Sequence, residues 1–245
     1  MLLPDKKIIV TGGASGIGAA TVRAYAREGA RVAALDVQDA SGRRVAAEAG
    51  DAVTYHHCDV SSREAVHEVF ARVVAGLGGL DVLAHVAGLE RGTPAEDIPD
   101  EEWDLVFAVN VKGTLYTNQA AFRHMQTRGG HIINFGSGAG IRGQRGSAHY
   151  SAAKGAVMAW TRTVAQEWAR YGITVNSIVP AIWTPMYEAY RQRMVRAGAR
   201  HPRPGDAARH PARAIPSATS RPSWSSWPAT ARVSSPGRCS RSTAA

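Results

Sequence analysis

The chain has 245 residues, of which 44% are hydrophobic, and a formal net charge of +9. This length fits a single α/β domain with a substantial core, and the sequence lacks the run of about eighteen apolar residues that a membrane span requires. The positive charge comes from residues 191–245, where 11 arginines stand against one acid, Asp206, so the remainder shows no basic excess that would favour nucleic acid.

Cysteine content and the N-terminal residues bear on the cellular compartment. Cys58 and Cys239 are the two cysteines, and their spacing matches neither a metal site nor a disulfide framework. A strand-like segment begins near residue 7, which leaves no room for a signal peptide. We therefore expect a cytoplasmic protein that holds no metal and binds neither membranes nor nucleic acid.

Strand-like and helix-like segments alternate along most of the chain. Short apolar runs predict strands at 7–11, 31–36, 52–57, 80–86, 130–136 and 173–179. Periodic stretches between them predict helices at 16–28, 39–49, 63–77, 100–128 and 149–171. Such alternation implies one domain over residues 1–196, a doubly wound α/β fold whose parallel sheet is covered by helices on both faces.

A glycine-rich turn, Gly12-Gly-Ala-Ser-Gly-Ile-Gly18, follows the first predicted strand and opens a helix. In this context the glycines let the backbone approach a pyrophosphate at the helix N-terminus, as in dinucleotide-binding turns. Asp36 ends the second strand, where a carboxylate binds both ribose hydroxyls and repels a 2′-phosphate, so NAD is favoured over NADP. The alternative is a glycine-rich turn without a ligand.

Two polar residues leave alternatives open. Asp59 follows the third strand, where it could bind the adenine amine or cap the next helix. Asn110 lies in the middle of the predicted helix 100–128, a position that suits asparagine poorly. It could mark a loosened turn that holds a water beside the site, or make an ordinary core hydrogen bond.

Tyr150 and Lys154 lie four residues apart near the start of a predicted helix, so their side chains share one face. An ammonium beside a phenol favours the phenolate, and together with a bound cofactor cation we expect it to lower the pKa of Tyr150 by about 2–3 units, so that the tyrosine could exchange a proton with an alcohol near neutral pH. Ser137, at the end of the fifth strand, offers a hydroxyl to the same substrate oxygen. Taken alone, this spacing more often marks a tyrosine and a lysine that are both solvated at the surface. The upstream motifs are what favour the catalytic interpretation.

The segment from Pro180 to Tyr187 is suited to a lid over the nicotinamide.

Together these residues resemble the short-chain dehydrogenase/reductase family over roughly residues 4–190. The matching positions are Thr11-Gly12-x-x-x-Gly16-x-Gly18, Asp36, Asp59-Val60, Ala87-Gly88, Asn110, Ser137, Tyr150-x-x-x-Lys154 and Pro180 with Thr184. The resemblance implies a Rossmann-type sheet and an NAD(H)-dependent oxidoreductase that interconverts a secondary alcohol and a ketone. It also implies a small-molecule substrate, such as a steroid, sugar, cyclic alcohol or 3-oxoacyl thioester, and a homodimer or homotetramer.

The resemblance assigns roles to individual residues. Tyr150 is the general acid/base, Ser137 positions the substrate oxygen, Lys154 binds the nicotinamide ribose and lowers the tyrosine pKa, and Asn110 holds a relay water. The implied cofactor contacts are Gly12, Ser15, Gly16, Ile17, Gly18, Asp36, Asp59, Val60, Ala87, Gly88, Tyr150, Lys154, Pro180, Ile182 and Thr184, the last two at the carboxamide. The predicted substrate pocket, an apolar-leaning set, consists of Leu89, Glu90, Gln144, Trp183, Met186 and Tyr187.

The sequence departs from the family pattern in three places. His85-Val86 replaces the usual Asn-Asn, which puts a strand-tying hydrogen bond in doubt, and Ala181 replaces the glycine that usually follows Pro180. The third departure is the tail at 197–245, which is rich in Arg, Pro and Ser and lacks the family's seventh strand.

We hypothesise that this tail results from a frameshift. Codons can be chosen for residues 219–244 such that reading them in a frame shifted by one base gives a typical family ending. The alternative is a genuine basic arm. Two other functions stay open: a nucleotide-binding homologue with weak or no activity because of the altered C-terminus, and nucleic-acid binding through the tail.

Overall fold

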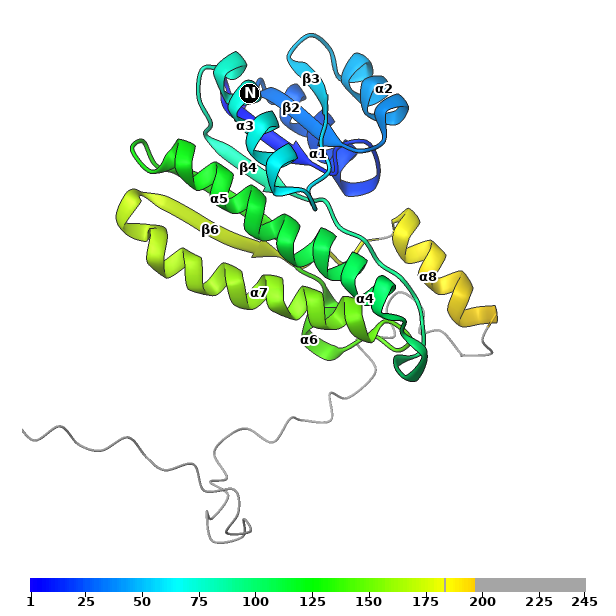
Figure 1. The fold of residues 1–245 in the computed structure, drawn as a ribbon. Helices are drawn as coiled ribbons and strands as arrows, with labels where there is room; N and C mark the ends of the chain where they lie inside the picture. The colour runs from blue at the N-terminus through cyan, green and yellow to red at the C-terminus, as the bar shows by residue number, and fades with distance from the viewer. Residues whose placement is uncertain (183, 197–245) are drawn as a thin grey trace, which may run out of the picture. The chain divides into compact units, whose positions relative to one another are not determined.

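The computed structural model describes residues 1–182 and 184–196, so the hypotheses about the tail and about Trp183 lie outside the described residues. The described chain forms a parallel six-stranded sheet in the order β3-β2-β1-β4-β5-β6 (Figure 1). The strands are β1 (Lys7–Thr11), β2 (Arg31–Asp36), β3 (Val53–His57), β4 (Val82–His85), β5 (Gly130–Phe135) and β6 (Ile173–Ile178). All six predicted strands are present, and the predicted doubly wound α/β fold is confirmed.

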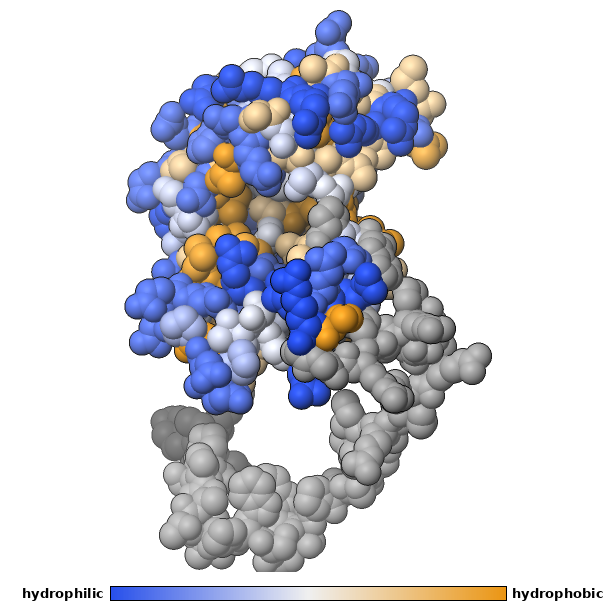
Figure 2. Space-filling view, turned by 90° about the vertical axis from the view of Figure 1, so that its right-hand side faces the viewer, coloured by the Kyte–Doolittle hydropathy of each residue, from blue (hydrophilic) through white to orange (hydrophobic). Residues whose placement is uncertain are grey.

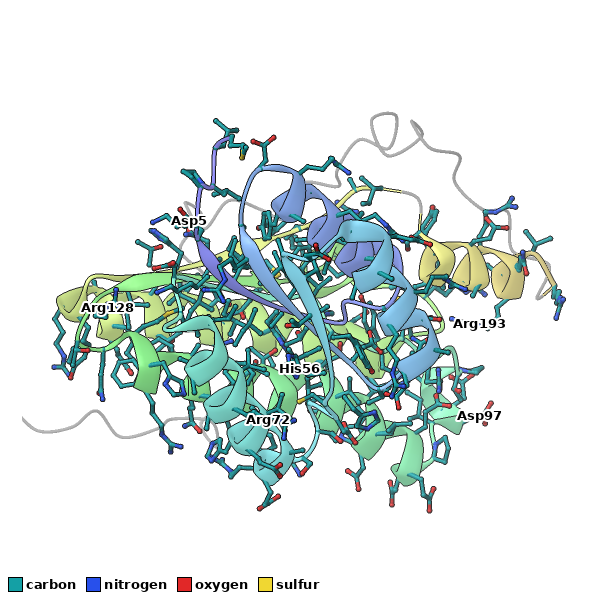
Figure 3. All side chains as sticks on the ribbon, turned by 90° about the horizontal axis from the view of Figure 1, so that it is seen from above. Asp5, His56, Arg72, Asp97, Arg128 and Arg193 are labelled. Atoms are coloured by element: carbon teal, nitrogen blue, oxygen red, sulfur yellow. The ribbon has the colours of Figure 1, made fainter. Side chains whose placement is uncertain are left out.

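Helices cover both faces of the sheet, as a view from above shows for α1 and α3 (Figure 3). The α-helices are α1 (Gly16–Arg27), α2 (Asp39–Ala49), α3 (Arg63–Leu77), α4 (Asp100–Phe107), α5 (Gly113–Met125), α6 (Gly138–Arg142), α7 (Ala148–Trp168) and α8 (Pro185–Arg196). Short 3₁₀ turns lie at Ala95–Asp97 and Ala169–Tyr171. Within the described ranges, no helix is both long enough and apolar enough to cross a membrane.

Two apolar clusters hold the layers together. On one face, α3, α5 and α7 pack on the sheet around Phe70, Leu83 and Trp168. On the other face, α1 and α2 pack around Val22 and Val45. Strands β1 and β2 are buried on both sides, which explains their nearly continuous apolar sequences.

The predicted helix 100–128 is interrupted by a π-helical turn at Ala108–Lys112. The amide of Asn110 donates to the carbonyl of Val106 at 2.9 Å and to that of Leu89 at 2.7 Å, while Thr114 donates to the Asn110 carbonyl at 2.6 Å. These side-chain bonds stabilise a widened turn, so the expectation of a loosened helix at Asn110 is confirmed. The predicted helical region 100–128 is thus divided by this turn into α4 and α5.

The strand order reverses between β1 and β4, since the chain crosses from β1 to β2 on one side and later reaches β4 on the other. In open α/β sheets this switch point leaves a crevice at the carboxyl ends of the strands. Figure 2 shows a hollow with apolar side chains at its base on this side of the molecule. The glycine turn after β1 and Ala87-Gly88 after β4 therefore meet at one crevice.

Candidate active site

The crevice is a cleft of about 490 Å³, within the size range of small-molecule and cofactor sites. Most of the predicted cofactor contacts line it: Gly12, Ser15, Gly16, Ile17, Gly18, Asp36, Asp59, Val60, Ala87, Gly88 and Thr184. Sequence reasoning missed other lining residues that carry no motif of their own, among them Val37, Gln38, Cys58, Arg91 and Leu105.

Two glycines of the turn are required by close backbone contacts. A Cβ at Gly12, whose φ is +69°, would lie 2.8 Å from the backbone of Ala87. A Cβ at Gly18 would lie 1.9 Å from the carbonyl oxygen of Gly12. The turn therefore packs against the end of β4 and against the first turn of α1, whose N-terminus borders the cleft with a partial positive charge suited to a pyrophosphate.

Asp36 is buried at the end of β2 and is fixed by the backbone on both sides. One carboxylate oxygen accepts from Ala14 N–H of the glycine turn at 3.0 Å, and the other accepts from Gln38 N–H at 3.0 Å. The carboxylate thus has a fixed orientation beside the cleft, where a ribose would have to approach it.

The other acid at this end, Asp59, lies at the exposed rim of the cleft. Its carboxylate accepts from the backbone and hydroxyl of Ser61 at 2.9 and 2.7 Å. The cap of α3 is Ser62, whose hydroxyl accepts from Ala65 N–H at 3.2 Å. The interpretation of Asp59 as the helix cap was wrong, while its contact with adenine stays a prediction.

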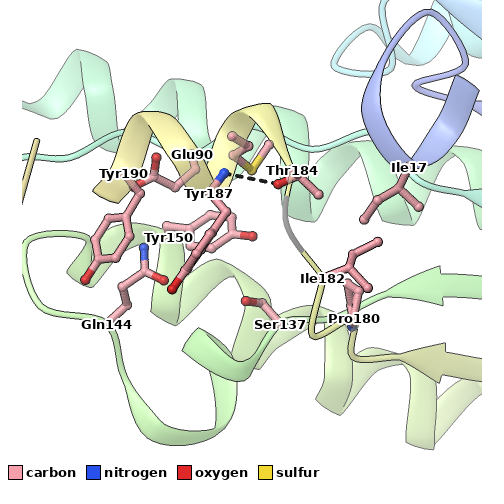
Figure 4. A pocket seen from close by; sticks show the side chains of 12 residues that line it. Ile17, Glu90, Ser137, Gln144, Tyr150, Pro180, Ile182, Thr184, Tyr187 and Tyr190 are labelled. Atoms are coloured by element: carbon pink, nitrogen blue, oxygen red, sulfur yellow. Dashed lines mark hydrogen bonds between the residues drawn. The ribbon is translucent and has the colours of Figure 1, made fainter. Parts of the chain in front are cut away.

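A second, smaller cavity of about 130 Å³ adjoins the cleft, and Ile17, Thr184 and Met186 line both spaces. Ser137 and Tyr150 point into this cavity (Figure 4). Four residues of the predicted substrate set line it: Glu90, Gln144, Met186 and Tyr187. Of the other two, Leu89 lines the larger cleft and Trp183 lies outside the described residues.

The walls of the small cavity also include residues from the C-terminal segment. Pro180 and Ile182, predicted as cofactor contacts, lie here next to Thr184. Sequence reasoning missed Tyr190 of α8, which carries no recognisable motif.

The side chains of Ser137 and Tyr150 line the same small cavity, and the Ser137 hydroxyl lowers the pKa of Tyr150. Ser137 is held at the start of α6, where its oxygen accepts from Ala139 N–H at 3.1 Å. Lys154 lies one turn after Tyr150 on α7, with Nζ 5.8 Å from the tyrosine ring centroid, and donates to the carbonyl of Phe135 at 2.9 Å. The strand end at β5 therefore orients both the serine and the lysine toward the tyrosine.

The pKa of Tyr150 is raised in the protein alone. Burial raises it above the ordinary value and the Glu90 charge raises it further, whereas the Ser137 hydrogen bond lowers it. Lys154 is itself desolvated, which lowers the pKa of its ammonium to about 8. In the protein alone desolvation of the phenol therefore outweighs the other influences on the pKa of Tyr150, and the expected fall with a bound cofactor cation stays a prediction.

Asn110 and Lys154 meet across Gly88. A Cβ at Gly88 would lie 3.0 Å from Asn110 Oδ1 and 3.2 Å from Lys154 Nζ. Asn110 Oδ1 also accepts from Leu89 N–H at 3.3 Å, so its side chain fixes the loop that follows β4. The structure thus brings all four predicted catalytic residues to one end of the sheet, around Gly88 and the small cavity.

Comparison with known proteins identifies this arrangement. The model of the short chain dehydrogenase family matches residues 6–194. The chain belongs to this family. It is accordingly an oxidoreductase that acts on alcohols or ketones with a nicotinamide cofactor.

Several relatives within the family are dehydrogenases or reductases. Sorbitol dehydrogenase of Cereibacter sphaeroides is 40% identical over 184 residues, which cover 74% of this chain and 72% of that protein. D-threitol dehydrogenase of Mycolicibacterium smegmatis is 36% identical over 184 residues, covering 74% and 71%. A crystal structure of a short chain dehydrogenase from Mycobacterium smegmatis has a TM-score of 0.71 and 35% identity, covering 79% of this chain and 86% of that one.

His85, which departs from the usual sequence of the short-chain dehydrogenases, is fully buried between β1 and α5. Its Nδ1 lies 2.8 Å from Thr11 Oγ1 and 3.1 Å from Thr117 Oγ1, and Ala87 N–H donates to Thr11 Oγ1 at 3.3 Å. Burial lowers the pKa of His85 to about 3, so the imidazole is neutral. Val86 has no polar side-chain group to replace the lost asparagine, and Thr11, His85 and Ala87 connect β1 to the end of β4 instead.

Proposed function

We propose that this protein interconverts a secondary alcohol and a ketone with NAD(H), and that Tyr150 is its general acid/base. The observation that carries the proposal is that Ser137 and Tyr150 together line a small cavity that adjoins the glycine-lined cleft. When bound, the nicotinamide supplies or accepts the hydride.

The shape of the cleft supports a dinucleotide. Gly12 and Gly18 leave no room for side chains between the turn, β4 and α1, while a Cβ at Gly16 would have nothing within 4 Å and would project into open space. Asp36 supports NAD over NADP, because its fixed carboxylate would repel a 2′-phosphate. The cation on the following helix, Arg43 of α2, is exposed, and its guanidinium nitrogen lies 3.7 Å from a carboxylate oxygen of Asp39.

In the oxidation direction, Ser137 and Tyr150 hold the alcohol oxygen and the Tyr150 oxygen takes its proton; in the reduction direction the proton returns to the ketone oxygen. Burial keeps the free protein's tyrosine protonated, ready for reduction. Oxidation requires the phenolate, which the Lys154 ammonium and a cationic nicotinamide would both favour. Asn110 and the Leu89 backbone hold the loop beside Lys154 and would place the relay water there.

The small cavity favours a compact, hydroxylated substrate over a steroid or an acyl thioester. Its volume is about 130 Å³, well below that of sites for drug-sized molecules. Glu90, Gln144, Ser137 and Tyr150 contribute polar atoms to its walls. The relatives named for sorbitol, D-threitol and glycerol make polyols the first substrates to test.

The test combines cofactor binding with turnover. We expect NADH to bind more tightly than NADPH, and a panel of polyols and cyclic alcohols to include a substrate oxidised with NAD. Tyr150→Phe should keep NADH affinity and lose about 10²- to 10⁴-fold in turnover. A Tyr150→Phe variant as fast as the parent would refute the proposed role.

One outcome of the same assay would favour an alternative function. Tight NADH binding without turnover of any alcohol would favour the second hypothesis, an inactive nucleotide-binding homologue. We also propose a cytoplasmic homodimer or homotetramer, and sedimentation velocity on the full chain would measure the assembly.

A further inference from the structure

Glu90 carries a buried carboxylate at the edge of the small cavity. Its side chain is 3% exposed, and the Ser147 hydroxyl at the start of α7 donates to Oε1 at 2.7 Å. Arg193 of α8 donates to the two carboxylate oxygens at 2.6 and 2.5 Å. A buried carboxylate is thus paired with a cation that lies 103 residues further along the chain.

The surroundings leave space for this ion pair. A Cβ at Gly92 would lie 2.3 Å from Nε of Arg193, so a larger residue there would displace the guanidinium. The Arg193 side chain is 39% exposed, which means that its stem lies at the surface of α8 while its charged end reaches a buried partner.

Helix α8 forms one wall of the small cavity through Met186, Tyr187 and Tyr190. The opposite wall comes from Ser137 and Tyr150. Figure 4 shows Glu90 beside Tyr150, where α8 passes over the cavity, and Arg193 is labelled near α8 in Figure 3. The ion pair therefore connects α8, a helix at the surface, to the loop that borders Tyr150.

We propose that Glu90 and Arg193 form a clamp that holds α8 over the substrate cavity, and that Arg193 shields Tyr150 from the charge of Glu90. The proposal rests on the proposed function, since it assigns positioning residues to that reaction. Burial is the main cause of the raised pKa of Tyr150 and Tyr190, and the Glu90 charge, which borders the same cavity, raises both further.

Other groups also face the two members of this interaction. Tyr150 meets Ser137 and, on its own helix, Lys154; Tyr187 and Tyr190 of α8 share the cavity. Glu90 meets Ser147 and Arg193. Among these groups Arg193 is the cation that contacts Glu90 directly, so its removal changes the charge next to the tyrosine.

Removing Arg193 should therefore produce two separable defects. Helix α8 loses its anchor, so the substrate cavity loosens and KM rises. The Glu90 carboxylate loses its counter-charge, so the pKa of Tyr150 rises and the pH profile of kcat/KM moves to higher pH. Adding Glu90→Gln removes the charge without restoring the anchor, so it should correct the second defect alone.

The experiment compares Arg193→Met, Arg193→Lys, Glu90→Gln and the Arg193→Met/Glu90→Gln double variant in the full chain. Arg196→Met, on the exposed last turn of α8, is the matched control. With NAD and the best alcohol of the panel, we expect Arg193→Met to raise KM about tenfold and to raise the pH midpoint by about half a unit to one unit. Arg193→Lys should recover part of the KM loss, and the double variant should recover the midpoint but not KM.

A readout independent of turnover keeps the clamp testable on its own. Hydrogen exchange of the amides at 186–196 should quicken in Arg193→Met and stay at the parent rate in Arg196→Met. Parent-like exchange and parent-like KM in Arg193→Met would overturn the clamp. A pH midpoint that Glu90→Gln fails to restore would overturn the shielding. If the parent oxidises no alcohol, the proposed function fails, and the exchange measurement alone decides the clamp.

Discussion

Lys154 is 5% exposed, and its ammonium donates to the Phe135 carbonyl at 2.9 Å. Desolvation lowers its pKa from 10.5 to about 8, so the unfolded chain binds this proton more tightly than the folded one. Burial of the charge therefore costs stability below pH 8, and the cost fades as the pH rises from 8 toward 10.5.

We expect Lys154→Met to be more stable than the parent by about 2–3 kcal/mol at pH 7 while losing activity. The gap should narrow by pH 9.5, and urea denaturation at both pH values measures it. Lys112→Met, at an exposed position, is the control and should change little at either pH. A Lys154→Met variant that is less stable than the parent at pH 7 would contradict this reasoning.

His85 gives a pH effect at the acid end. Burial lowers the pKa of His85 from 6.5 to about 3. Between these pH values the unfolded chain therefore binds a proton at His85 that the folded chain does not bind. Stability should fall as the pH drops from 6.5 toward 3. His85→Asn, which lacks the titrating ring, should flatten this dependence between pH 6.5 and 4.5 in chemical denaturation. Equal slopes for the parent and the variant would show that His85 does not cause the acid sensitivity.

At the residue scale, the sequence predicted which side chains gather but not how they act on one another. Ser137, Tyr150 and Lys154 lie where their motif spacing placed them. The direction of the tyrosine pKa could not be predicted, because it depends on burial and on the distant Glu90. The pairing of Glu90 with Arg193 spans 103 residues, and neither residue belongs to a motif that would connect them.

Among the secondary-structure elements, the π-helical turn at Ala108–Lys112 gives a prediction for both stability and activity. Asn110→Ala removes three hydrogen bonds that join this turn to Val106 and to the Leu89 backbone. We expect about 1–3 kcal/mol lower stability, because buried backbone groups lose their partners. We also expect a lower kcat, because the loop beside Lys154 loosens.

The matched control for this variant is Asn118→Ala on the following helix. Asn118 is also a buried asparagine, but it bonds Asn134 and Trp160 in the core. It should lower the free energy of unfolding to a similar extent and leave kcat near the parent value. Similar kcat losses in both variants would mean that Asn110 acts only through stability.

Element boundaries could be predicted where apolar periodicity and glycine stops agree. Strand β2 and helices α2 and α3 have the predicted bounds, and β4 is shorter than predicted, at Val82–His85. The turn at Asn110 was visible as a polar residue in an apolar helix. Helix α6 was missed, because five residues with two glycines give no periodic pattern.

At the scale of the whole molecule, β6 is the last strand of the described sheet and pairs with β5 alone there. On one of its faces Thr174, Asn176 and Ile178 are exposed. An edge strand that pairs on one side only tends to associate with other chains. The family's seventh strand would cover it, which is why the reading frame beyond residue 196 matters.

We expect the gene to carry a one-base insertion or deletion, relative to near relatives, within the codons for residues 190–245. Sequencing that stretch and the next hundred bases or so would reveal it. The family match stops at residue 194, close to the point where the hypothesis places the change. An intact frame would show instead that the arginine-rich tail is genuine.

The site also divides along the sequence. One part of the cleft is lined by the glycine turn, by Asp36–Gln38 and by Cys58–Ser61, and all of these segments come before α3 in the chain. Apart from Ile17, the residues that line the small cavity all come from Glu90 onward. A crossover placed within α3 would therefore separate coenzyme choice from alcohol choice, so exchange of either half with a relative could recombine the two preferences in one chimaeric enzyme.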